Sequence, residues 1–208
     1  MERVLDVYKR HYSEENPVIC MDESPKQLIE ELRPSIPMKP GRQARTDYEY
    51  VRNGVINIFI ANEPLKGKRM VEVTESKTKQ DWAKFMKRIA DQQYPNAKKI
   101  TLVMDNFNTH NASSFYETFE PKEAKRLWDR FEFIYTPKHG SWLNMAEIEL
   151  HVLNGQCLNR HIPTIKKIKQ EIKAWEKSRN KKKNTINWQF TTKDARIKLR
   201  QLYPAVEL

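Results

Sequence analysis

Three acidic residues lie where the chain leaves an apolar run or enters a helical pattern. Asp22 follows the apolar run 18–21, Asp105 follows the run 100–104, and Glu147 opens a helical pattern. The run before Asp105 does not alternate and is too short for a helix, which predicts a strand buried on both faces. Open α/β sheets place their chemistry at the carboxyl ends of such strands, and a buried acid there needs a cation beside it. The three carboxylates therefore suit two Mg²⁺ ions, with Mn²⁺ as a substitute, held about 3.5–4 Å apart to activate a water or a 3′-hydroxyl in phosphodiester displacement.

Each of these acids also has a purely structural explanation. Asp22 fits a turn position, and Asp105 fits an Asx turn. Asn144 and Glu147 have the spacing of a capping box, with Asn144 at N-cap and Glu147 at N3. Glu149 is a rival to Glu147, but residues two apart on a helix point to nearly opposite faces, so only one of them can face the end of the sheet. The residues alone leave these alternatives open.

The order of strand and helix patterns predicts an α/β fold. Residues 17–24, 48–61 and 69–74 have strand patterns and together predict an antiparallel meander. A capping box at Thr78 and Asp81 predicts the start of a helix. Further strands are expected at 100–104 and 131–135, and further helices at roughly 112–129, 143–158, 165–175 and 193–203. A meander followed by α/β alternation is typical of a ribonuclease-H-like mixed sheet, antiparallel and then parallel, flanked by helices.

The length of 208 residues suits one folded domain with additions at its ends. We expect a lead-in segment at 1–15, a catalytic domain at 16–180, and a basic linker with a C-terminal helix at 181–208. Four prolines and a glycine predict a long loop at 25–46. The sequence shows neither a membrane span nor the apolar core of a signal peptide, and its two cysteines suit reduced core thiols. These features predict a cytoplasmic protein, associated with the nucleoid if it acts on DNA, and no membrane partner.

The formal net charge of +11 is unevenly distributed. Residues 160–183 contain ten Lys and Arg against two acids, and residues 33–45 contain four basic residues and no acid. Such clusters predict double-stranded DNA as a partner, although the first cluster also fits the outer face of an amphipathic helix. Histidines near the acids are candidates for phosphate or base contacts, with an ordinary hydrogen-bonded or surface role as the alternative. The expected DNA-binding residues are Arg33, Lys39, Arg42, Arg45, His110, Lys138, His139, Lys166, Lys167, Lys169 and Lys173.

Three stretches resemble the catalytic blocks of the IS630 family of bacterial insertion-sequence transposases, which belongs to the Tc1/mariner group. These are VICMDES at 18–24, VMDN at 103–106 followed by His110, and YTPKHGSWLNMAE at 135–147. Residues 48–54 and 187–192 also resemble that family. The likeness extends from about residue 16 to 204, and its third block is long and specific.

The resemblance implies that Asp22, Asp105 and Glu147 form the DDE triad of a ribonuclease-H-like transposase core. It implies Mg²⁺-dependent hydrolysis at transposon ends and strand transfer into target DNA at a TA dinucleotide, carried out by a homodimer on DNA. In this sequence Met145 and Ala146 stand where many relatives have Pro-Ile, and the interval from Asp105 to Glu147 is longer than in eukaryotic relatives; neither departure removes a ligand. The family also carries an amino-terminal helix-turn-helix region, for which the residues before the first catalytic strand leave no room. We therefore expect a separate helix-turn-helix region and little end specificity from this chain alone.

Two other functions fit the same residues. The first is a stand-alone ribonuclease-H-like nuclease that cuts RNA–DNA hybrids or junctions. The second is a non-catalytic DNA-binding remnant that regulates an intact transposase, and such a remnant would keep the basic clusters without needing all three acids.

Overall fold

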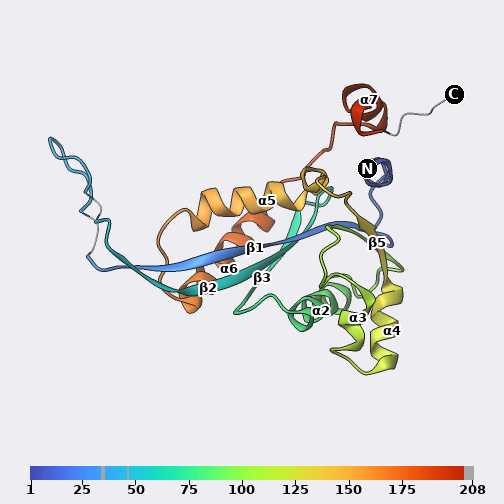
Figure 1. Ribbon diagram of the computed structural model, residues 1–208, viewed down its shortest axis with the longest axis horizontal. Coiled ribbons are helices and arrows are strands. Elements are labelled where there is room, and N and C mark those ends of the chain that lie inside the picture. Colours follow the sequence, from blue (N-terminus) through green and yellow to red (C-terminus); the bar gives the residue numbers. More distant parts are fainter. Residues whose placement is uncertain (34–35, 46, 204–208) are drawn as a thin grey trace.

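A mixed five-stranded sheet forms the centre of the computed structural model, which describes residues 1–33, 36–45 and 47–203 (Figure 1). Its strands are β1 Val18–Glu31, β2 Tyr50–Glu63, β3 Lys68–Thr74, β4 Ile100–Met104 and β5 Phe131–Tyr135, in the order β3-β2-β1-β4-β5. β1, β2 and β3 pair in antiparallel fashion, whereas β4 runs parallel to β1 and β5 runs parallel to β4. The predicted meander and the parallel strands that follow it are confirmed, and the architecture is ribonuclease-H-like.

Helices cover both faces of this sheet (Figure 1). They are α1 Glu2–Tyr8, α2 Lys79–Arg88, α3 Ala112–Tyr116, α4 Pro121–Arg130, α5 Ala146–Leu153, α6 Ile165–Lys182 and α7 Thr192–Lys198. Short 3₁₀ or π-helical turns are formed by Ile89–Gln93, Ser141–Leu143, Asn154–Leu158 and Arg200–Leu202. On one face, Trp82 of α2 and Phe115 of α3 share an apolar core with Met21 of the sheet. On the other face, Ile168 and Trp175 of α6 lie in a second core. The capping box predicted before α2 is present.

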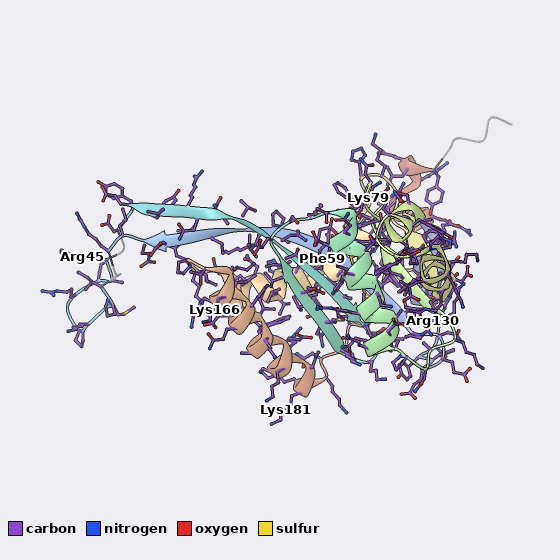
Figure 2. The ribbon with its side chains drawn as sticks, turned by 90° about the horizontal axis from the view of Figure 1, so that it is seen from below. Arg45, Phe59, Lys79, Arg130, Lys166 and Lys181 are labelled. Atoms are coloured by element: carbon purple, nitrogen blue, oxygen red, sulfur yellow. The ribbon has the colours of Figure 1, made fainter. Side chains whose placement is uncertain are left out.

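Beyond the core residues Leu28 and Ile56, the paired strands β1 and β2 extend from the body as an arm, of which residues 29–33, 36–45 and 47–55 are described (Figures 1 and 2). The prediction of a loop over 25–46 is therefore wrong in its first part, because β1 continues through Pro25 as far as Glu31. Pairing of β1 with β4 ends at Cys20, so that side of β1 is an edge at Pro25. Proline has no N–H to donate, and edge strands tolerate this loss. Residues 34, 35 and 46 of the predicted loop lie outside the described residues.

The tip of the arm is a small hairpin rather than an open loop. Backbone hydrogen bonds run in both directions between Ile36 and Arg45 and between Lys39 and Arg42. Gly41 has φ 75, and a proline precedes it, which is the pair of residues that a type II turn prefers. The tip therefore presents its basic side chains from a defined turn, and Figure 2 shows Arg45 at the far end of the arm.

The amino-terminal helix α1, which lies in the segment expected as a lead-in, packs against the core. Val4, Leu5 and Val7 of α1 are buried in the same core as the residues of α6. α1 also pairs with α7, where Arg196 Nε donates to Glu2 Oε1 over 2.7 Å. Three apolar residues on one turn of a short helix were too weak a sequence pattern to predict this docking.

Three other features of the sequence can be compared with the structure. Cys20 and Cys157 are buried free thiols, as expected. None of the helices in the described ranges combines the length and the apolar composition needed to cross a membrane. α6 continues to Lys182, so the basic segment expected as a linker from residue 181 begins as helix, and residues 204–208 lie outside the described part of the chain.

Candidate active site

The strand pairing places Asp22 and Asp105 side by side. In the parallel pair of β1 and β4, Cys20 is opposite Val103. Each acid lies two residues beyond that pair on its own strand, so both occupy the carboxyl end of the parallel part of the sheet. Asp105 directly follows β4, whose five residues are all buried, as predicted. Asp22 does not end its strand, because β1 continues into the arm. It marks instead the point where β1 loses β4 as a neighbour.

Asn144 connects the start of α5 to the strand that carries Asp22. It is 1% exposed, and its side-chain amide donates to the Met21 carbonyl over 2.8 Å and to Asp22 Oδ2 over 3.4 Å. Its side-chain oxygen accepts from the backbone N–H of Ala146 over 3.1 Å. Glu147 is the second residue of α5. The N-cap residue of this helix is Met145, which makes no side-chain capping hydrogen bond. The capping-box alternative for Glu147 is therefore not the arrangement observed.

Glu149 lies on the opposite side of α5 from the candidate site, as its spacing from Glu147 predicted. It is completely buried and accepts two hydrogen bonds from Arg69, of 2.9 Å from Nε and 2.6 Å from Nη2. Arg179 of α6 is a second cationic partner at 3.2 Å. These contacts join α5, α6 and β3, so Glu149 has a structural role, and Glu147 is the carboxylate of α5 left for chemistry.

The electrostatics of Asp22 show that the three acids act on one another. Burial, together with the charges of Glu23, Asp105 and Glu147, raises the pKa of its carboxyl to about 7, against the effect of a hydrogen bond from the Glu23 N–H. The negative charges of Asp105 and Glu147 therefore act on the Asp22 carboxyl and disfavour its ionised form.

His110 holds Asp105 from the other face of the sheet. Its Nδ1 lies 2.7 Å from Asp105 Oδ1, and its Nε2 lies 3.3 Å from Glu23 Oε2; these are ion-pair contacts without hydrogen-bond alignment. Although burial alone would lower the pKa of His110, the two carboxylates raise it to about 9, and His110 in turn lowers the pKa of Asp105 against the effect of burial. The ring stacks on Trp82 and is 1% exposed. His110 therefore does not offer a surface to DNA, which corrects its prediction as a DNA contact.

The donor chemistry of Asp22, Asp105 and Glu147 fits a divalent metal. All three offer carboxylate oxygens, which Mg²⁺ and Mn²⁺ prefer. Asp22 is partly buried and surrounded by the negative charges of Glu23, Asp105 and Glu147, a condition that a bound cation would relieve. Within the described ranges no three His, Cys, Asp or Glu side chains are already grouped as metal ligands, so the carboxylates do not form a preassembled cluster.

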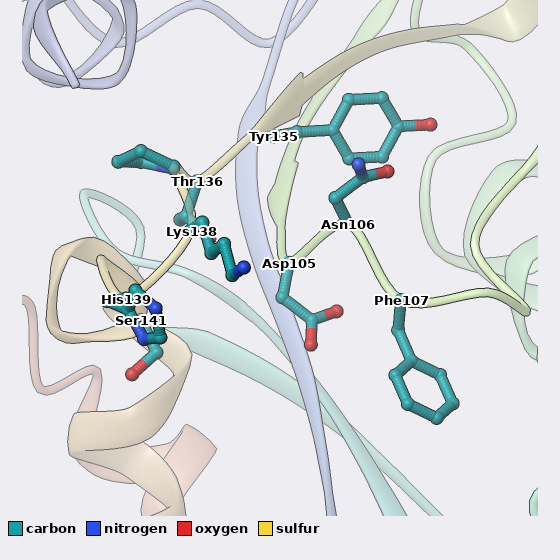
Figure 3. Close-up of a pocket in the computed structure, with 9 residues that line it drawn as sticks. Asp105, Asn106, Phe107, Tyr135, Thr136, Lys138, His139 and Ser141 are labelled. Carbon is teal, nitrogen blue, oxygen red and sulfur yellow. The ribbon is translucent and has the colours of Figure 1, made fainter.

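A cavity of about 580 Å³ opens beside Asp105 (Figure 3). Lys138 and His139, both predicted DNA contacts, line it together with Asn106 and Phe107. In Figure 3 the Lys138 side chain extends toward the Asp105 carboxylate, with Phe107 on the other side of that carboxylate. Phe107 was not predicted from the sequence, although an aromatic residue two positions after a candidate ligand was an available signal.

The other predicted DNA-binding residues lie on two surfaces away from this cavity. Lys39, Arg42 and Arg45 are exposed at the tip of the arm, where Arg33 is partly neutralised by Asp47 at 3.5 Å. The predicted lysines of α6 are also exposed; they are Lys166, Lys167, Lys169 and Lys173. Lys167 forms an ion pair of 3.0 Å with Glu171. Apart from the buried His110, the predicted DNA contacts that the described structure brings to Asp105 are Lys138 and His139.

Comparison with solved structures supports the same class of fold. The Mos1 mariner paired-end complex with Mn has a TM-score of 0.58 and 16% identity, covering 85% of this chain and 52% of that chain. The pre-cleavage Mos1 transpososome has a TM-score of 0.55 and 14% identity, covering 88% of this chain and 59% of that chain. The Mos1 strand transfer complex also has a TM-score of 0.55 and 14% identity, covering 85% of this chain and 51% of that chain. This chain therefore spans about half the length of these relatives, and at such low identity the likeness concerns the fold.

The fold and its acidic sheet end define a ribonuclease-H-like, metal-dependent nuclease class. Within that class a family model described as DDE superfamily endonuclease matches residues 17–169, a range that includes Asp22, Asp105 and Glu147. The chain belongs to the DDE superfamily of endonucleases. No curated protein has a matching sequence.

Proposed function

We propose that this chain is the catalytic domain of an IS630-type transposase, which hydrolyses phosphodiester bonds at transposon ends and joins the resulting 3′-hydroxyl to target DNA. The observation that supports the proposal is the pairing of β1 with β4, which brings Asp22 and Asp105 to the same end of a ribonuclease-H-like sheet, where the charge of Glu147 also raises the pKa of Asp22. The superfamily match, which spans all three, supports it. Joining at a TA dinucleotide, action as a homodimer and action on the bacterial nucleoid in the cytoplasm belong to the same proposal.

In this proposal Asp22, Asp105 and Glu147 hold two Mg²⁺ ions, or Mn²⁺ in their place. When bound, the ions supply activation of the attacking water or 3′-hydroxyl and stabilise the leaving oxygen. The protein supplies the positions of the ligands: His110 and Glu23 fix Asp105 from behind, and the Asn144 amide orients Asp22. Removing such supporting contacts commonly lowers metal affinity or activity about tenfold or more.

Cationic side chains account for binding of the DNA backbone. Lys138 points toward Asp105 and offers an ammonium group to a phosphate that approaches the acids (Figure 3). The arm carries Lys39, Arg42 and Arg45 well away from the body of the molecule, where they can contact DNA remote from the cut (Figure 2). Contacts of this kind position the duplex without reading its sequence, and they weaken steeply as salt is added.

The test is nicking of supercoiled plasmid in the presence of Mn²⁺ by the unaltered chain and by Asp105→Asn. Glu120→Gln serves as the matched control, because Glu120 is an exposed acid outside the site. We expect nicking by the unaltered chain and the control, and none by Asp105→Asn at the same melting temperature. Equal nicking by all three proteins would overturn the proposal. An RNA–DNA hybrid assayed in parallel separates a transposase domain from a stand-alone hybrid nuclease.

A further inference from the structure

The cavity beside Asp105 has the size of a pocket for a small organic ligand. Its volume of about 580 Å³ lies within the range of pockets that hold small organic ligands, roughly 300–1,000 Å³. Its walls combine an acid, two basic side chains and two aromatic rings, those of Phe107 and Tyr135. This mixture of charge and aromatic surface matches a nucleotide, which has an anionic phosphate at one end and a flat base at the other.

Phe107 is held in place although much of its surface faces solvent. Its side chain is 41% exposed and lines the cavity. The ammonium group of Lys77 lies 3.9 Å from the centroid of its ring, and Lys77 is itself fixed by Glu23 at 2.7 Å. His110 meets the ring edge-on, with centroids 5.9 Å apart. An exposed aromatic ring supported in this way is a preorganised stacking surface.

The opposite parts of the cavity are also fixed. The Tyr135 hydroxyl donates to the His110 carbonyl over 3.0 Å, which ties that ring to the loop after β4. His139 adopts φ 61, a left-handed conformation that is uncommon for a residue other than glycine and that recurs in ligand-binding loops. Asn106 is exposed and lines the cavity, where its amide can donate to and accept from the edge of a base.

We propose that this cavity binds one unpaired nucleotide of the DNA substrate, next to the phosphate held at Asp105. Its base stacks on Phe107, Asn106 meets the edge of the base, and Lys138 contacts its phosphate. Both faces of a base in a duplex are covered by neighbouring bases, so a side-chain ring can stack only on a base that has left the helix. The inference rests on the proposed function and adds to it that the DNA must be locally unpaired at the site of cutting.

The test compares binding of two DNA probes in Ca²⁺, which supports binding without cleavage. One probe is a fully paired duplex, and the other carries two unpaired nucleotides with 2-aminopurine at the first. Removing the stacking of one base on an aromatic ring weakens binding about fivefold to a hundredfold. We therefore expect Phe107→Ala and Phe107→Leu to bind the unpaired probe more weakly by this factor and to bind the paired duplex as the unaltered chain does. Phe107→Trp should bind as the unaltered chain does. Tyr116→Ala is the matched control, since Tyr116 is 47% exposed and outside the lining of the cavity.

Fluorescence of the probe reports the contact directly. The unaltered chain and Phe107→Trp should quench 2-aminopurine on binding, and Phe107→Ala should not. The inference would be overturned if Phe107→Ala bound and quenched the unpaired probe as the unaltered chain does. It would also be overturned if Phe107→Ala lost as much affinity for the paired duplex as for the unpaired probe. If the Phe107 results are as expected but the chain never nicks DNA in Mn²⁺, the proposed function fails and the nucleotide site stands. If nicking depends on Asp105 but not on Phe107, only the inference fails.

Discussion

Replacing Asp22 with Asn should make the metal-free protein more stable at neutral and alkaline pH. The pKa of Asp22 is raised from 3.8 to about 7 by burial and by the charges of Glu23, Asp105 and Glu147. Because the folded-state pKa lies above the unfolded value, stability falls as the pH rises between about 4 and 7, and the full penalty remains above pH 7. The difference of about three pH units corresponds to about 4 kcal/mol at most. Since the carboxyl is only partly buried, solvent screening should reduce the gain to about 1–2 kcal/mol.

Thermal melting of both proteins at pH 8 and pH 5.5, without metal and with Mn²⁺, measures this effect. For a chain of this size the gain corresponds to about 2–8 °C at pH 8, and it should shrink at pH 5.5, where Asp22 is largely protonated. Mn²⁺ should raise the melting temperature of the unaltered protein by mass action and that of Asp22→Asn much less. Asparagine keeps an acceptor for the Glu23 N–H but loses the acceptor for the Asn144 amide at 3.4 Å, and this loss offsets part of the gain. A melting temperature below that of the unaltered protein at pH 8 without metal would refute the reasoning.

Three further substitutions test the supporting structure. Glu149→Gln should lower the free energy of unfolding in urea by about 3–5 kcal/mol, because it leaves Arg69 buried without its carboxylate partner; a loss below 1 kcal/mol would contradict that role. His110→Gln should weaken Mn²⁺ affinity about tenfold in calorimetry while the far-ultraviolet circular dichroism is unchanged, and an unchanged affinity would remove His110 from the positioning of Asp105. Gly67→Ala should cost about 1–3 kcal/mol in urea, because an added Cβ would lie 2.5 Å from the Lys183 carbonyl carbon; Gly41→Ala, with no described atom within 4 Å, should cost less.

Local patterns in the sequence were enough for most of the secondary structure. The buried strand before Asp105, the capping box before α2 and the apolar stripe of α6 depend on neighbouring residues, and all three are present. The arm was missed because Pro25 and the prolines after it predict a break, whereas pairing with β2, in which Asn57 lies opposite Pro25, keeps β1 extended. Pairing between distant segments of this kind leaves no local pattern.

The candidate site also has a part that local sequence patterns predict and a part that depends on distant contacts. Patterns of strands and helices predicted Asp22, Asp105 and Glu147 as candidates, and helix geometry predicted that Glu147 and Glu149 face opposite sides of their helix. The support for Asp105 was not predictable, since the contacts of His110 with Asp105 and Glu23 depend on how the loop after β4 folds back against the sheet. One signal was available: Glu23 follows Asp22 in a strand, so their side chains point to opposite faces of the sheet.

The most direct test of the central claim is a Mn²⁺ titration followed by electron paramagnetic resonance, comparing the unaltered chain with the triple variant Asp22→Asn, Asp105→Asn, Glu147→Gln. We predict two bound Mn²⁺ ions per unaltered chain and none on the variant over the same concentrations, with both proteins folded by circular dichroism. Two ions retained by the variant would contradict the assignment of these three carboxylates as the metal ligands.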